Sequence, residues 1–126
     1  MNTERIYRQC KLCGNLIGMI HDSGVVPECC GQPMELLVPN TVDAAKEKHV
    51  PVIIRDGATV TVKVGSTAHP MIPEHFIQWI ALAQGSRTQR VALTPADLPE
   101  AVFACEPGPV TIYAYCNLHG LWMSKE

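Results

Sequence analysis

The sequence predicts a mainly β protein in two parts: a small cysteine-rich metal-binding module, followed by a small antiparallel β-sandwich. Four of the six cysteines lie in the first 30 residues. The chain after them contains strand-like runs at spacings of about 8–12 residues, separated by turn residues, as is typical of a sandwich. The stretch LLVPNTV reads as a connector, so we place the boundary near Pro39, with modules at 1–38 and 39–126.

Length and composition limit the function. With 126 residues, 47% of them hydrophobic, the chain suffices for one packed domain and a small module. A net charge of −2 disfavours a nucleic-acid partner, because phosphates attract a basic face. No apolar run approaches the roughly 18 residues of a membrane span, and MNTERIYRQC lacks the apolar stretch of a signal peptide. We therefore expect a cytoplasmic protein with reduced cysteines and no membrane partner.

The second module shows strand patterns along its length. In VPVIIRDGATVTVKV, Asp56-Gly57 is a hairpin signal, and the three valines of TVTVKV alternate with polar residues as in a strand with one buried face. PVTIYAYC has the same character, and TPADLPE reads as a loop. HFIQWIALAQ also fits a helical stripe, but its β neighbours and the Gly-Ser pair that follows favour a strand.

The first candidate metal site consists of the cysteines of CKLCG and CCG: Cys10, Cys13, Cys29 and Cys30. A Cys-x-x-Cys turn lets two thiolates reach one ion, and four thiolates suit zinc or a single iron. The spacing alone leaves both metals open, and disulfides are the weaker alternative in a reducing compartment. Neighbouring side chains diverge in extended backbone, so the adjacent cysteine pair should require a local twist.

The second candidate site combines four of the five histidines, each close to a proline or glycine, with one cysteine: His49, His69, His75, His119 and Cys116. Histidine is the commonest metal ligand, and strand ends on a rigid sandwich can hold an open site. Zinc rarely takes five ligands, whereas four imidazoles and a thiolate suit iron, although spacing does not prove that geometry. A Cys–His nucleophilic dyad is the alternative, but the sequence shows no third orienting group.

Other residues of these types have simpler interpretations. His21 lies in a polar HDSG turn and reads as a surface residue. Cys105 reads as a buried strand residue, because a free cysteine behaves as a small hydrophobe. Phe76, Trp79 and Trp122 read as core residues.

Taken together, these segments resemble one family. The chain resembles the desulfoferrodoxins, two-iron superoxide reductases, over essentially its full length. CKLCG…CCGQPM is similar to their desulforedoxin-type module, and EKHVPVI, HPM…EHFIQWI and YCNLHG are similar to the segments that bind the reactive iron. The resemblance implies a desulforedoxin-like module, an immunoglobulin-like antiparallel β-sandwich, a homodimer and two non-haem irons per chain.

Matched segment by segment, the resemblance implies that the four cysteines of the first module hold the first iron. It implies that His49, His69, His75 and His119 form an equatorial ring around the second iron, with Cys116 as the axial ligand. No ligand position departs from the family pattern. The implied reaction is the one-electron reduction of superoxide to hydrogen peroxide, a defence against oxidative stress, with rubredoxin as the suggested electron donor.

Glu47 and Lys48 directly precede the first of these histidines. By themselves they read as a solvated charged loop. The resemblance implies instead that the lysine lies over the vacant position and that the glutamate can bind the oxidised iron. Two other functions stay open on the sequence: an electron carrier without catalysis, and a zinc-stabilised interaction module.

Overall fold

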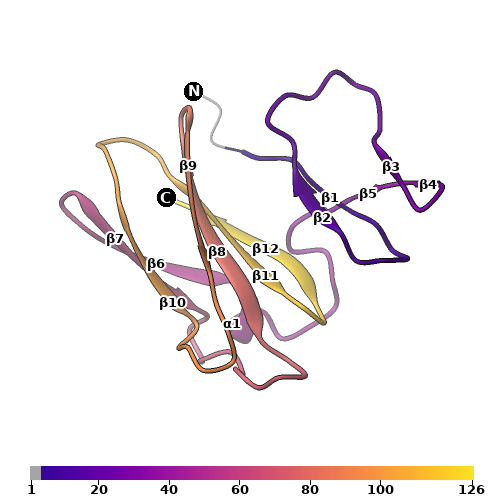
Figure 1. Cartoon of the computed structure of the whole chain (residues 1–126). Coiled ribbons are helices and arrows are strands. Elements are labelled where there is room, and N and C mark those ends of the chain that lie inside the picture. Colours follow the sequence, from indigo (N-terminus) through magenta and orange to yellow (C-terminus); the bar gives the residue numbers. More distant parts are fainter. Residues whose placement is uncertain (1–3) are drawn as a thin grey trace. The chain divides into compact units, whose positions relative to one another are not determined.

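The computed structural model describes residues 4–126, which form two compact units, residues 4–38 and residues 39–126. Residues 1–3 of the predicted first module lie outside the described part. Apart from one helical turn, the regular elements of the described residues are β-strands (Figure 1). This confirms the predicted fold class.

Five short strands build the first unit. A three-stranded antiparallel sheet has the order β2-β1-β5, and β3 pairs with β4 in a separate hairpin. The bounds are Tyr7–Gln9 for β1, Leu16–Gly18 for β2, Glu28–Cys29 for β3, Gln32–Pro33 for β4 and Glu35–Leu36 for β5. The buried hydrophobic residues among those described in this unit are Tyr7, Cys10 and Met34. So small a core is typical of modules that a bound metal stabilises.

The second unit is a sandwich of two antiparallel sheets, with strand orders β10-β7-β6 and β12-β11-β8-β9 (Figure 1). The bounds are Pro51–Asp56 for β6, Thr59–Val64 for β7, Ile77–Gln84 for β8, Arg87–Ala92 for β9, Glu100–Ala104 for β10, Thr111–Cys116 for β11 and Gly120–Lys125 for β12. These seven strands form the antiparallel sandwich that the strand patterns predict, with the immunoglobulin-like architecture that the family resemblance implies.

The core of the sandwich lies between its two sheets. Val60, Val62 and Val64 of β7 are fully buried, as their alternation predicts, and they share one cluster with Ile80 of β8 and Ile112 of β11. Burying a side chain of this size contributes about 1.5–3 kcal/mol. The sandwich therefore provides a rigid base for the loops at its ends.

The strand predictions are confirmed in most details. The β6–β7 turn consists of Gly57 and Ala58, one residue later than predicted. HFIQWIALAQ does contain a strand, β8, in which four consecutive residues from Ile80 to Ala83 are fully buried. Burial on both faces removes the alternation that marks a half-exposed strand, which explains the resemblance to a helical stripe. Cys105 is buried as predicted, but it lies one residue beyond β10.

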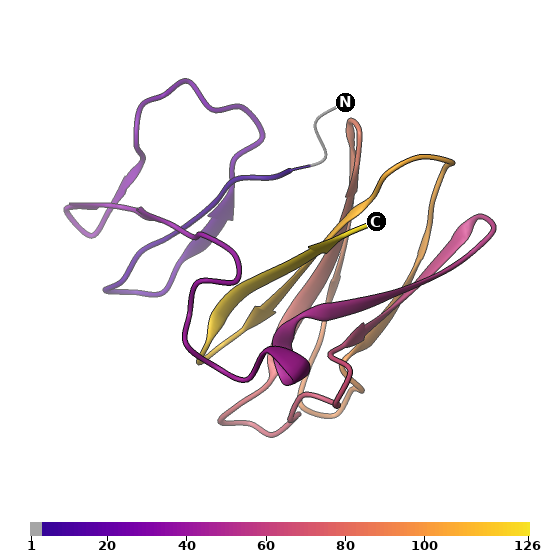
Figure 2. The ribbon, with the colours of Figure 1, turned by 180° about the vertical axis from the view of Figure 1, so that it is seen from behind.

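Glu47 and Lys48 are exposed, as their interpretation as solvated residues predicts, but they do not lie in an irregular loop. They belong to the single helical turn α1, Lys46–His49, which lies at the end of the sandwich where β6 begins (Figure 2). Local sequence does not predict this turn, because a four-residue helix is unstable without tertiary contacts. In the described part of the chain, no helix has the length and apolar character that crossing a membrane requires.

The predicted connector is attached to the sandwich. Asn40 adopts a left-handed backbone conformation with φ 64°, and its backbone N–H donates to the carbonyl of Leu121 at 3.1 Å. Its carboxamide donates to the carbonyl of Met123 at 3.0 Å and accepts the N–H of Met123 at 2.8 Å. Asn40 thus pairs with the edge strand β12, and it places the segment that leads to α1.

Candidate metal centres

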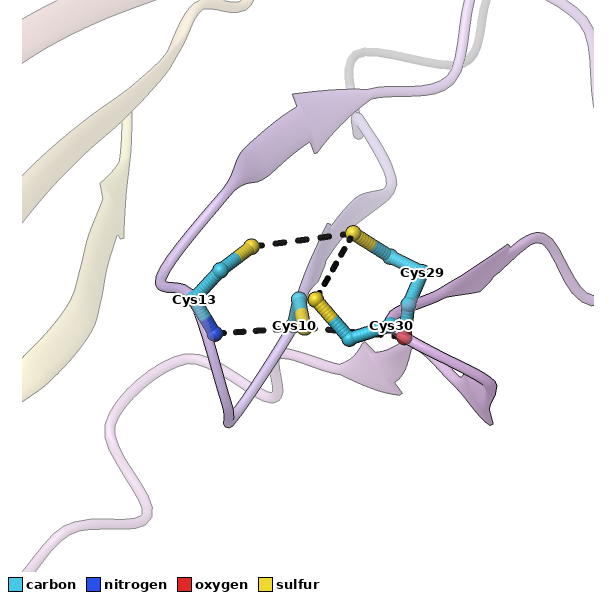
Figure 3. A group of neighbouring side chains, drawn as sticks. All are labelled: Cys10, Cys13, Cys29 and Cys30. Carbon is cyan, nitrogen blue, oxygen red and sulfur yellow. Dashed lines mark hydrogen bonds between the residues drawn. The ribbon is translucent and has the colours of Figure 1, made fainter.

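The four cysteines of the first unit come together as one cluster (Figure 3). Their sulfurs lie within 4.8 Å of one another, and no disulfide joins them. The Sγ–Sγ distance is 3.6 Å between Cys13 and Cys29 and 4.0 Å between Cys29 and Cys30. Four sulfurs around one ion at about 2.3 Å would be about 3.8 Å apart, so the cluster fits a tetrahedral metal.

A tight turn between β1 and β2 presents the first two sulfurs. Gly14, at φ 83°, donates its N–H to the carbonyl of Cys10 at 2.8 Å. The N–H of Cys13 points at the sulfur of Cys10, 3.5 Å away, and this hydrogen bond is the largest of the causes that lower the pKa of the Cys10 thiol to about 6. The turn therefore favours the thiolate, which is the metal-binding form.

The predicted twist at the adjacent cysteine pair is present. Cys30 and Gly31 form the two-residue turn between β3 and β4, and both have positive φ, 54° and 73°. A hairpin turn of this kind requires positive φ at both positions, which is unfavourable for a residue other than glycine. Hydrogen bonds with the sulfurs of Cys13 and Cys10 raise the pKa of the Cys30 thiol to about 12. A bound cation would favour ionisation of all four thiols.

The four predicted histidines of the second unit form a closed ring of imidazoles. Neighbouring centroids are 4.7 Å apart for His49–His69, 4.6 Å for His69–His75, 5.0 Å for His75–His119 and 4.9 Å for His119–His49. Neighbouring planes cross at 80–83°. The opposite rings of His49 and His75 are 6.3 Å apart and tilted by only 31°. The four rings therefore surround one point.

Two of the nitrogens that face this point, on His49 and His69, carry no proton. His49 and His69 donate their Nδ1–H groups to the carbonyls of Ala45 at 2.6 Å and Pro70 at 2.7 Å. Both Nε2 atoms of these neutral rings are then acceptors, yet they lie only 3.2 Å apart. The buried Nε2 of His75 has no hydrogen-bond partner among the described residues. Such an arrangement is unfavourable unless a cation occupies the centre, so the residues fit a metal.

Cys116 completes the second centre. Its sulfur is fully buried and lies 3.9 Å from Nδ1 of His119. The ligand atoms of Cys116, His49, His75 and His119 all lie within 4.8 Å of one another. Burial raises the pKa of the Cys116 thiol, while the backbone N–H groups of His119 and Leu118 hydrogen-bond the sulfur and act in the opposite direction.

Asn117 holds the backbone around His75, a ring whose buried Nε2 has no hydrogen-bond partner among the described residues. Its Oδ1 accepts the N–H of Phe76 at 2.9 Å, and its Nδ2 donates to the carbonyl of Glu74 at 3.0 Å. The two bonds hold the backbone on both sides of His75. Sequence reasoning missed this role, although the place of Asn117 between ligands Cys116 and His119 was a possible signal.

Trp122 is buried, as its interpretation as a core residue predicts, but it also contacts the centre. Its indole N–H donates to the carbonyl of His119 at 3.1 Å, and its ring lies 4.8 Å from that of His49. In contrast, His21 is exposed and belongs to neither candidate centre among the described residues.

The surroundings of the second centre lower the pKa values of His49, His69 and His75. Burial is the main cause that lowers the pKa of His69 to about 4, and it also lowers those of His49 and His75. The positive charge of Lys48 adds to the effect on His75, and the negative charge of Glu47 opposes it at His49. The exposed side chains of α1 therefore lie within electrostatic reach of the ring.

Comparisons with known proteins agree with this geometry. A family model described as desulfoferrodoxin matches residues 41–125. A desulfoferrodoxin from Syntrophotalea carbinolica is 53% identical over 117 residues, covering 93% of each chain. The superoxide reductase from Treponema pallidum has a similar structure, with a TM-score of 0.77 and 39% identity over 96% of this chain and 98% of that one. A superoxide reductase from Giardia intestinalis, described as a 1Fe-SOR, has a TM-score of 0.57 and 31% identity, covering 64% of this chain and 98% of its own.

Metal-free protein should lose stability as the pH falls from about 7 to about 5. An unfolded histidine takes up a proton near pH 6.5, whereas His69 in the folded protein does so near pH 4. Over this range the unfolded chain binds more protons, so protonation favours unfolding. Urea unfolding followed by the fluorescence of Trp79 and Trp122 measures this in the second unit. His69→Gln should flatten the decrease and His21→Gln should not; a midpoint independent of pH would contradict neutral buried imidazoles.

Asn117→Ala should weaken metal binding at the second centre by roughly 10–100-fold, because the backbone on both sides of His75 loses its anchor. Asn117→Asp keeps the acceptor for Phe76 but loses the donor to Glu74, so an intermediate effect is expected. Competition of the ferrous protein with a chelator measures the affinity, and the first centre provides the internal control. Equal retention of both metals by Asn117→Ala would show that Asn117 does not position the ligand.

Proposed function

We infer that this chain, which belongs to the desulfoferrodoxin family, is a superoxide reductase that acts at an iron centre built from His49, His69, His75, His119 and Cys116. The observation that carries this inference is the closed ring of four imidazoles with a buried thiol beside it. Structural zinc sites have four protein ligands, whereas four nitrogens and a sulfur suit iron. The chain accordingly has two iron sites. One has four cysteines, and the other has His49, His75, His119 and Cys116, with His69 completing the ring beside His49 and His75.

The reaction converts superoxide into hydrogen peroxide by the addition of one electron and two protons. The bound iron supplies one-electron redox chemistry. Burial lowers the pKa values of His49, His69 and His75, so these imidazoles stay neutral and their nitrogens are available as ligands. The thiolate of Cys116 would hold the iron and donate electron density to it, and the N–H groups of Leu118 and His119, which hydrogen-bond the sulfur, would limit that donation.

We propose that Lys48 attracts the superoxide anion and that Glu47 binds the iron when the second centre is oxidised. Both side chains are exposed, and both lie on α1, which ends at the ligand His49. A lysine about 4 Å from superoxide would stabilise it by about 1 kcal/mol in water and about 4 kcal/mol at an effective dielectric constant of 20. Superoxide offers few other contacts, so this charge dominates its recognition. Burial lowers the pKa of His49 and the negative charge of Glu47 opposes this effect, which supports a position of the Glu47 carboxylate close to the metal ligands.

We also propose the organisation around this centre. Residues 1–38 would be the desulforedoxin-like module with the first iron, and residues 39–126 the superoxide reductase domain. A homodimer in the cytoplasm, reduced by a rubredoxin, agrees with the family resemblance. The exposed side chains of Cys13 and Cys30 support electron entry at the first iron, because electron transfer needs a close approach of the donor.

Metal analysis combined with a superoxide assay tests the proposed function. We expect two irons per chain, visible iron–thiolate absorption, and superoxide consumption that yields hydrogen peroxide without dioxygen. Cys116→Ser should abolish the activity, while Cys105→Ser, which alters a buried thiol outside both centres, should retain it. Dioxygen release would indicate a dismutase, absence of consumption an electron carrier, and a colourless zinc protein an interaction module.

Lys48→Ile should slow superoxide capture by roughly tenfold at low ionic strength and flatten its dependence on salt, because the attracting charge is lost. Pulse radiolysis measures the second-order rate constant. Lys63→Ile provides the control, since Lys63 is an exposed lysine on β7. Identical rates and salt dependences for wild type and Lys48→Ile would refute the role of Lys48 in attracting superoxide.

Glu47→Ala should leave superoxide reduction largely intact but alter the visible spectrum of the oxidised second centre, because a carboxylate ligand would be missing. Glu74→Ala is the matched control on the loop that carries His75; its side chain is exposed, and only its backbone carbonyl bonds Asn117. A ferric spectrum that is the same in wild type and Glu47→Ala would exclude ligation by Glu47.

A further inference from the structure

The helical turn α1 depends on contacts with the rest of the sandwich. It has four residues, and its N-cap residue, Ala45, makes no side-chain hydrogen bond to it. Isolated helices shorter than about 12 residues are marginal in water. Because α1 carries Glu47, Lys48 and the ligand His49, whatever holds this turn also sets the position of these three side chains.

The turn after β7 makes this contact. The N–H of Thr67 donates to the carbonyl of Glu47 at 2.9 Å, and the hydroxyl of Ser66 donates to the same carbonyl at 3.3 Å. The chain then continues to the ligand His69, whose N–H donates to the carbonyl of Val64 at 2.9 Å. One turn therefore joins α1 to a second segment of the metal centre.

Gly65 allows this turn to approach α1 so closely. A Cβ atom at this position would lie 2.6 Å from the carbonyl oxygen of Glu47, 3.0 Å from that of Val50 and 3.1 Å from the carbonyl carbon of Lys48. All three are backbone atoms, which cannot rotate away as a flexible side chain can. The φ of Gly65 lies outside the left-handed region, so glycine is required here by the close approach and not by its backbone conformation.

We propose that Gly65 is a positioning residue, whose missing side chain lets the turn hold α1 where Lys48 can attract a small anion to the metal centre. This inference rests on the proposed role of Lys48. Any side chain at position 65 would push the Glu47–Lys48 backbone outward. The ammonium group of Lys48 would move with that backbone. Among the described contacts, no other segment approaches the backbone of Glu47 and Lys48 as closely as this turn does.

Azide binding to the ferric holoenzyme tests the proposal without turnover. Azide is a small monoanion, and a titration followed by visible absorption gives its Kd at several ionic strengths. We expect Gly65→Ala to raise the Kd about three- to tenfold at low salt and to flatten its salt dependence, as Lys48→Ile should. In the double variant, Gly65→Ala should add little to Lys48→Ile, because two changes that act through one group are not additive.

The control is Gly18→Ala in the first unit, where a Cβ would meet a ring carbon of Tyr7 at 3.3 Å; azide binding should not change. An unaltered Kd and salt dependence in Gly65→Ala would overturn the proposal. The proposal would also be overturned if Gly65→Ala raised the azide Kd by the same factor in the wild type and in Lys48→Ile. The glycine would then act independently of Lys48. If Lys48→Ile alone leaves the azide Kd and its salt dependence unchanged, the proposed role of Lys48 is itself wrong.

A second variant covers the case in which Gly65→Ala loses the second iron. Ser66→Ala removes only one of the two hydrogen bonds to the Glu47 carbonyl and introduces no atom near α1. We expect it to retain both irons and to shift azide binding in the same direction by a smaller factor. Unchanged azide binding in Ser66→Ala, when Gly65→Ala loses its iron, would overturn the positioning role.

Discussion

The second metal centre depends on one constraint: imidazole nitrogens, two of them acceptors on the buried His49 and His69, must face the same point. The Nε2 atoms of His49 and His69 lie 3.2 Å apart although both are acceptors, and in the described part of the chain the buried Nε2 of His75 has no partner. Such groups are unfavourable together without a cation. The folded chain therefore prepares a high-affinity site, at a cost in stability that the bound metal offsets.

Separate hydrogen bonds hold the histidine ligands in place at the end of the rigid sandwich. Backbone carbonyls orient two of the rings, Asn117 holds the backbone around His75, and Trp122 bonds the carbonyl of His119. Each of these hydrogen bonds involves a backbone group: the carbonyls of Ala45 and Pro70, or the backbone that Asn117 and Trp122 bind. The position of the ring thus follows from the packing of four chain segments, and it does not depend on any single long side chain.

The two units reach their metal sites in different ways. In the first, the small apolar core leaves the arrangement of the sulfurs to local turns, including the unfavourable left-handed backbone of Cys30. In the second, a large buried core supports loops that come from distant parts of the sequence. Local turns are visible in a sequence as Cys-x-x-Cys-Gly and Cys-Cys-Gly, whereas the closeness of distant loops is not. This is why the twist at Cys30 was predictable, while the contact of Trp122 with His49 was not.

The sequence by itself determined the fold class, most strands, and the chemistry of the ligands, because side-chain type and alternation are local properties. It left β8 ambiguous, since burial on both faces removes alternation, and it missed α1. Only the tertiary structure decided that the four rings close in the order His49, His69, His75, His119, and that Asn117 and Gly65 lie where they contact the ligand segments. These features come from contacts between residues far apart in the chain, and no local pattern encodes the distances between them.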